Sequence, residues 1–219
     1  MRARERCFSV SDRTIFRMVD SYTFAIDVVQ TIGDRLATKT AEIGHLSETN
    51  TSFVEWLVWE AFLACKLRQA SYPFCEVAAT PTYASEGVVD AGSATRNTGD
   101  LRVGGPEEGA NHCWAFIEFA LLGDANHAKE ETACQLNAAV ERLKRLGWKK
   151  SAALLLVLAV SQGDLLANWA EALVACGVWN QPTLTAPLVI ALPNGGTAVL
   201  KAFDCKRDPT HILTVGSGQ

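Results

Sequence analysis

The chain has no stretch of apolar residues long enough to cross a lipid bilayer. Its longest apolar run, from Ala152 to Val160, is much shorter than the roughly 20 residues that a transmembrane helix needs. The charged first residues are not followed by the apolar segment of a secretory signal peptide. We therefore expect a cytoplasmic protein that has no membrane partner.

The chain also lacks an excess of positive charge and any close pair of cysteines. Lys and Arg number 20 against 24 Asp and Glu, which argues against a dedicated DNA-binding module but leaves a local basic patch open. None of the seven cysteines belongs to a C-x-x-C pair, so a zinc site is not expected. Because most of the cysteines lie within apolar stretches, we expect reduced and buried thiols.

The motifs of several enzyme classes are missing as well. The chain has no P-loop, G-x-G-x-x-G, G-x-S-x-G or H-E-x-x-H pattern, and its four histidines lie in separate segments. What is there is a chain of 219 residues, 48% of them hydrophobic, with a mean hydropathy of +0.08. This composition is typical of a globular protein and excludes a disordered chain.

Hydrophobic spacing and turn residues predict the order of the helices and strands. We expect a helix over residues 11–39, a polar loop over 44–51, and a second helix that begins at the capping box of Ser52 and Glu55 and ends at Gln69. Strands are expected near 74–83, 100–103 and 112–122, followed by a helix over 124–147. The continuous apolar run 154–160 predicts a strand buried on both faces. A helix over 163–176 and a hairpin of strands 187–192 and 197–204, joined at Asn194-Gly195, complete the order.

This order predicts an α/β fold with one mixed sheet. The three strands in sequence form a meander, and the long helix crosses over to a fourth strand that lies parallel in the same sheet. We expect helices on both faces of the sheet. An N-terminal helical extension over residues 1–50 precedes an α/β domain over residues 51–219, and the whole forms one compact unit.

Three acidic residues stand out because each lies in or beside an apolar segment. Glu118 interrupts an apolar strand, Asp100 opens the preceding strand, and Glu60 shares a helical face with Trp56 and Leu63. A buried carboxylate costs several kcal/mol unless it is paired or binds a metal. Each acid also has an ordinary interpretation: a solvent-facing strand residue, a turn aspartate and an exposed helical residue, respectively.

These elements and acids together resemble the PD-(D/E)xK nuclease superfamily. The resemblance covers about Ser52 to Val160 and implies a restriction-endonuclease-like three-layer α/β/α fold with a mixed central sheet. It implies that Asp100 and Glu118 bind Mg²⁺ or Mn²⁺, and that Glu60 corresponds to the helical acid of many members. The lysine of the family motif falls on Ala120, so the E-x-K pattern lacks its cation.

Other residues near these acids have both a functional and an ordinary interpretation. Lys129, near the start of the crossover helix, is the candidate to replace the missing lysine, as relocated lysines do in some family members. Arg102 shares a strand face with Asp100 but is a poor base, because its guanidinium is always charged. Gln135 matches a glutamine of many members, or is a helix-surface residue. The basic residues at the end of this helix contact DNA phosphates or form a solvated face: Arg142, Lys144, Arg145, Lys149 and Lys150.

The sequence thus supports two functions. The first is a metal-dependent nuclease acting on DNA phosphodiesters, with Asp100, Glu118, Glu60 and Lys129 at its catalytic site. The alternative is a catalytically inactive protein of the same fold that serves as a binding or assembly module. The acidic net charge and Ala120 favour this alternative, and six tryptophans would favour it further where they are exposed. A homodimer is compatible with both functions.

Overall fold

The structure is a computed structural model, and it describes residues 21–49, 52–69, 74, 76–80, 99–105, 113–123, 129–144, 146, 151–162 and 181–206. These residues contain four helices: α1 (Ser21–Ala37), α2 (Thr40–Ser47), α3 (Val54–Gln69) and α4 (Lys129–Lys144). They also contain six strands: β1 (Glu76–Ala79), β2 (Leu101–Gly104), β3 (Trp114–Gly123), β4 (Ser151–Ser161), β5 (Leu188–Ala191) and β6 (Thr197–Asp204). None of these described helices has the length and apolar character that a membrane span requires.

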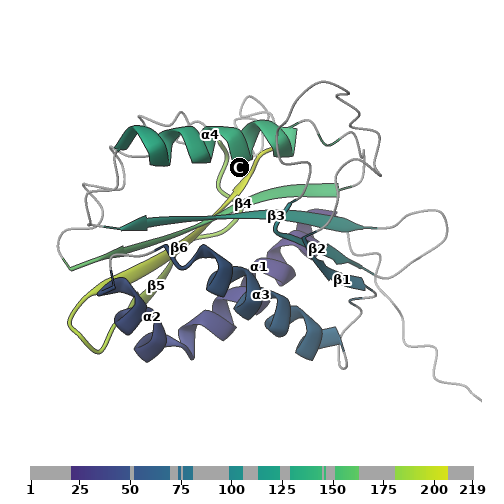
Figure 1. Cartoon of the computed structure of the whole chain (residues 1–219). Coiled ribbons are helices and arrows are strands. Elements are labelled where there is room, and N and C mark those ends of the chain that lie inside the picture. Colours follow the sequence, from purple (N-terminus) through teal and green to yellow (C-terminus); the bar gives the residue numbers. More distant parts are fainter. Residues whose placement is uncertain are drawn as a thin grey trace, which may run out of the picture.

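The strands form one mixed sheet in the order β1-β2-β3-β4-β6-β5. β1, β2 and β3 are an antiparallel meander, and β4 lies parallel to β3 after the crossover through α4 (Figure 1). β6 pairs antiparallel with β4, and β5 forms the far edge. The expected meander, crossover and parallel fourth strand are therefore confirmed.

Helices cover both faces of this sheet, with α4 on one face and α1, α2 and α3 on the other (Figure 1). β4 shows why its sequence is apolar without alternation. Leu154 and Leu156 belong to the core shared with α1 and α3, whereas Leu155 and Val157 belong to the core under α4. Since successive side chains of a strand point to opposite faces, a strand covered on both faces needs apolar residues throughout. The expectation of a doubly buried strand is confirmed.

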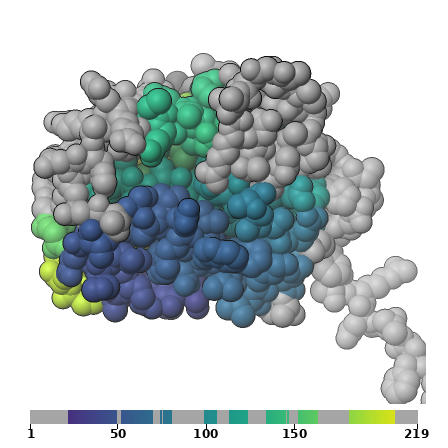
Figure 2. Space-filling view, viewed as in Figure 1, coloured from purple at the N-terminus to yellow at the C-terminus, as the bar shows by residue number. Residues whose placement is uncertain are grey.

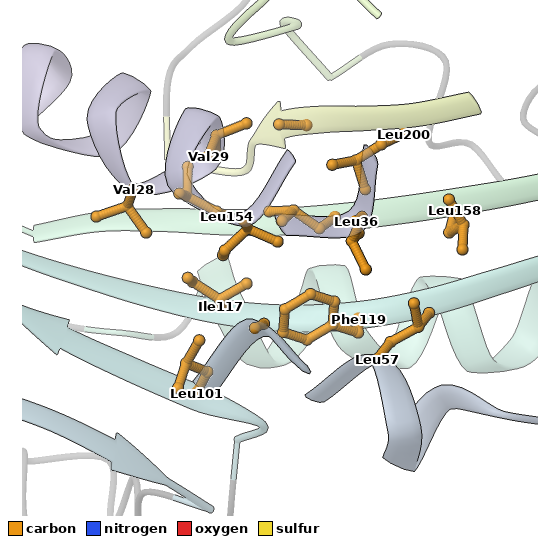
Figure 3. Packing of buried hydrophobic residues seen from close by; sticks show 14 of the residues in the cluster. Val28, Val29, Leu36, Leu57, Leu101, Ile117, Phe119, Leu154, Leu158 and Leu200 are labelled. Carbon is orange, nitrogen blue, oxygen red and sulfur yellow. The ribbon is translucent and has the colours of Figure 1, made fainter. Parts of the chain in front are cut away.

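The larger core lies between the sheet and the layer of α1 and α3 (Figure 3). Val28, Ile32 and Leu36 recur at four-residue steps along α1, and all three are fully buried. They belong to the same hydrophobic cluster as Leu154 of β4 and Leu57 of α3. α1 therefore covers the same sheet as the rest of the fold, although the sequence places it in an N-terminal extension.

The prediction of a polar loop over residues 44–51 is wrong for residues 44–47, because helix α2 continues to Ser47. Ile43 and Gly44 are buried there, and Asn194 of the β5–β6 turn donates a hydrogen bond from Nδ2 to the carbonyl of Gly44 at 3.3 Å. Packing against this distant turn stabilises a helix that the local glycine and polar residues do not predict.

The turn between β5 and β6 confirms the hairpin that Asn194-Gly195 predicts. Gly195 has a φ of +84°, a conformation that glycine adopts without steric cost. The amide of Leu192 donates to the carbonyl of Gly196 at 2.9 Å, which closes the turn. The helix expected over 163–176 lies outside the described residues.

The described cysteines are free thiols that differ in exposure. Cys65 on α3 and Cys205 after β6 are buried, Cys113 is half-buried, and Cys134 on α4 is exposed. Burial raises the pKa of both Cys65 and Cys205 to about 12, because it disfavours the charged thiolate. The expected burial is therefore confirmed for Cys65 and Cys205 and is wrong for Cys134.

This contrast predicts selective alkylation. At pH 8 we expect iodoacetamide to label Cys134 at least about a hundredfold faster than Cys65 or Cys205, because only about 0.01% of a thiol with a pKa of 12 is thiolate at that pH. Peptide mapping by mass spectrometry over time measures each rate. In urea the three rates should converge, which provides the control. Equal rates in the folded protein would contradict the burial of Cys65 and Cys205.

Candidate functional site

The structure brings Asp100 and Glu118 to neighbouring positions in adjacent strands. β2 and β3 pair with Leu101 opposite Ile117, and each acid adjoins one residue of that pair. Oδ2 of Asp100 accepts a hydrogen bond at 2.8 Å from the amide of Phe119, the residue that follows Glu118. Both acids are buried. Of the sequence-predicted site residues that are described, these two lie together.

The side chain of Glu118 lies on the sheet face that α4 covers. Along β3, Ala115, Ile117 and Phe119 belong to the core toward α1 and α3, whereas Phe116 belongs to the core under α4. The two-residue alternation of a strand therefore places Glu118 on the α4 side. Only 2% of Glu118 is exposed, so its interpretation as a solvent-facing strand residue is wrong.

Arg142 of α4 neutralises this buried acid. Its Nε donates to Oε1 of Glu118 at 3.1 Å, and its Nη2 donates to Oε2 at 2.8 Å. Two parallel hydrogen bonds of this kind use the planar fork of a guanidinium, a geometry that lysine cannot provide. The carboxylate of Glu118 is thus neutralised by an arginine of the same chain.

Asp100 links three neighbouring strands. Its carboxylate accepts a hydrogen bond from the amide of Phe119 in β3. Its backbone carbonyl accepts a hydrogen bond at 3.0 Å from the amide of Thr80, the residue that follows β1. Because Asp100 itself directly precedes β2, these two bonds hold β1, β2 and β3 together at one place. Asp100 is buried and lies directly before β2, the position at which its ordinary interpretation as a turn aspartate places it.

Glu60 lies in the helical layer on the opposite face of the sheet from α4 (Figure 1). Its Oε2 accepts a hydrogen bond from Nε of Arg35 on α1 at 2.7 Å, and Nζ of Lys39 lies 4.0 Å from its Oε1. Glu60 is buried, so its interpretation as an exposed helical residue is wrong. These contacts link α3 to the α1–α2 segment and lie in a different layer from the ion pair of Glu118.

The remaining candidates near the two acids have separate positions. Arg102 forms an ion pair with Glu76 of β1, and its guanidinium lies 5.0 Å from the ring centroid of Trp114. Gln135 is exposed on α4, which confirms the helix-surface interpretation. Lys129 is the first residue of α4, but its side chain lies outside the described part of the structure.

The basic residues at the end of the crossover helix are described only in part. Arg142 is directed toward Glu118, and Lys144 is exposed with its Nζ 3.6 Å from Oε1 of Glu141. Arg145, Lys149 and Lys150 lie outside the described side chains. The expected DNA contact therefore stays a prediction, and Arg142 has a different described partner.

The described residues do not fit a resident Mg²⁺ or Mn²⁺ ion. Among them, no three His, Cys, Asp or Glu side chains form a group that could hold a metal. Both oxygens of Glu118 accept hydrogen bonds from Arg142, and a divalent cation would have to displace that guanidinium to gain an oxygen ligand. The assignment of Asp100 and Glu118 as metal ligands stays a prediction that this arrangement does not support.

Sequence reasoning missed the partners of two acids, Arg142 for Glu118 and Arg35 for Glu60. A signal for the first was present, because Arg142 directly precedes Leu143, which faces the sheet in the core under α4. A basic residue at the border of that apolar face can reach an acid on the strand below.

No protein-family model, no curated protein and no solved structure matches the chain.

Proposed function

We propose that this chain is a catalytically inactive binding or assembly module with a restriction-endonuclease-like α/β fold. The observation that carries the proposal is the bidentate ion pair of Glu118 with Arg142, at 2.8 and 3.1 Å. The family resemblance assigns a metal ligand to the position of Glu118, and here that carboxylate is neutralised by an arginine. Ala120, at the position of the family lysine, has no group that could move a proton.

The order of the elements supports the nuclease-like part of the proposal. The succession α3, β1, β2, β3, α4, β4 matches the helix, meander, crossover helix and fourth strand on which the resemblance is based. α1 and α2 add to one helical layer, and β6 and β5 extend the sheet beyond β4. Fold alone does not establish activity, so the site residues decide between the two functions.

A metal-dependent DNA nuclease is the second candidate, and one observation favours it. Asp100 accepts a hydrogen bond from the amide of Phe119, the residue after Glu118, so the two acids of the family motif lie next to each other. For this function Arg142 would have to release Glu118, and Lys129 would have to supply the missing cation. The first condition is not met in the described ion pair of Arg142 and Glu118, which is why we rank this function second.

Titration with Mn²⁺ distinguishes the two candidates without any choice of DNA substrate. We expect no site that is half-saturated below about 1 mM Mn²⁺, because Arg142 competes for the carboxylate of Glu118. Electron paramagnetic resonance of free Mn²⁺ measures the binding, and the wild type and Asp100→Asn should give the same weak isotherm.

The opposite result has a defined form. A stoichiometric Mn²⁺ site in the wild type that is lost in Asp100→Asn would overturn the inactive assignment. Metal-dependent cleavage of supercoiled plasmid or single-stranded DNA, abolished by the same substitution, would then establish the nuclease. Circular dichroism of Asp100→Asn verifies that the variant is folded.

A further inference from the structure

The outward surface of α3 exposes a row of large apolar side chains. Among the described residues, four large hydrophobic side chains are exposed, and three of them lie on α3: Trp59 at 58%, Leu63 at 41% and Leu67 at 67%. Their spacing of four residues places them along one side of the helix, which we call the α3 stripe. α2 and α3 form the front of the lower layer in Figure 2. An exposed apolar row on a soluble monomer indicates an interaction surface.

The α3 stripe is held in place by the residues beside it. The ring of Trp59 packs edge-on against Phe62, with 5.6 Å between centroids and an interplanar angle of 87°. Nζ of Lys66 lies 5.7 Å from the centroid of the same Phe62 ring. Side chains that are already ordered lose little conformational entropy on binding, so this surface is preorganised for a partner.

The charges along the stripe are opposite at its two ends. Glu55 is exposed one turn before Trp59, whereas Lys66 and Arg68 are exposed beside Leu67. A second copy of the same helix, laid antiparallel on the first, brings the acidic end of each copy to the basic end of the other. A surface that complements itself in this way is what a two-fold interface requires.

We propose that the α3 stripe is a self-association surface on which a second copy of the chain docks through an antiparallel α3–α3 contact. With the two-fold axis passing between Trp59 and Leu63 on the exposed side of α3, Trp59 faces the partner's Leu63, and Glu55 lies between the partner's Lys66 and the partner's Arg68. The proposal names the partner for the assembly function proposed above and rests on that function. The oligomeric state and the Mn²⁺ isotherm are measured separately, so each proposal fails on its own result.

Sedimentation equilibrium of the full chain over roughly 5–500 µM tests the proposal. We expect the wild type to dimerise reversibly within this range. Leu67→Glu and Leu63→Glu should each raise the dimer Kd at least about tenfold. Leu63→Glu places a charge in the apolar centre of the interface, and Leu67→Glu places a negative charge beside the partner's Glu55. Position 67 is the more exposed, so this variant keeps the test valid if Leu63→Glu fails to fold.

Two further variants separate this interface from general stickiness. Val189→Glu, at the exposed residue on the β5 edge, is the matched control and should leave the dimer Kd within about twofold. Glu55→Lys should weaken the dimer, and the same change combined with Lys66→Glu and Arg68→Glu should restore it, since the end charges again complement each other. Two results would overturn the proposal. The first is a wild type that stays monomeric over the whole concentration range, as expected if another segment or another protein covers the stripe. The second is a dimer whose Kd Leu67→Glu does not raise.

Discussion

Replacing Arg142 with methionine is expected to lower the free energy of unfolding by about 3–5 kcal/mol. Methionine retains much of the aliphatic volume of the arginine, but it removes the two hydrogen bonds at 2.8 and 3.1 Å from the buried carboxylate of Glu118. Removing the charged partner of a buried carboxylate costs more than the loss of most single contacts, which makes this the most informative substitution at the site. Urea unfolding at pH 7, followed by far-ultraviolet circular dichroism, measures the change.

Removing both members of the pair should reverse most of that loss. Glu118→Leu combined with Arg142→Met removes both charges of the pair from the core that holds Phe116 and Leu155, and we expect a stability within about 2 kcal/mol of the wild type. Lys144→Met, on the same helix and exposed, is the matched control and should change stability by less than about 0.5 kcal/mol. If Arg142→Met costs no more than Lys144→Met, the ion pair does not neutralise Glu118, and the inactive assignment loses its main support.

The parts of the fold that the sequence predicts are those with local causes. The apolar run of β4 predicts a doubly covered strand because every one of its positions is buried, and Asn194-Gly195 predicts the hairpin because the turn needs a positive φ. The meander and the parallel β4 follow from the order of the elements and the length of the crossover helix. The strand and the turn are specified by residues within each element, and the sheet order follows from the succession of these elements.

The parts that the sequence does not predict depend on contacts between distant segments. The last turn of α2 packs against Asn194, 150 residues further along the chain from Gly44. The candidate site is similar, since the position of Glu118 in an apolar strand predicts that it needs compensation but not whether a metal or an arginine supplies it. Arg142 stands 24 residues away, and only the packing of α4 on β3 brings it within hydrogen-bonding distance.

Replacing Ile32 with alanine is expected to lower the free energy of unfolding by about 2–5 kcal/mol, as for other fully buried large-to-small substitutions. Ile32 is 0% exposed. It belongs to the same hydrophobic cluster as Val28, Leu36 and Leu154, three residues that Figure 3 labels. Truncation to alanine removes three carbon atoms from the contact between α1 and the sheet. Since packing density in such a core is high, the cavity cannot close fully.

The size of this effect decides whether α1 is an appendage or part of the domain. Gln30→Ala, on the exposed side of the same helix, is the control and should change stability by less than about 0.5 kcal/mol. If α1 is integral, Ile32→Ala lowers the midpoint of a single cooperative transition, because the sheet cannot stay folded while its α1-facing side chains are in water. If instead residues 1–50 were a dispensable extension, Ile32→Ala would leave the main transition unchanged and produce a separate early one. The burial of Val28, Ile32 and Leu36 against the central strands favours the first outcome.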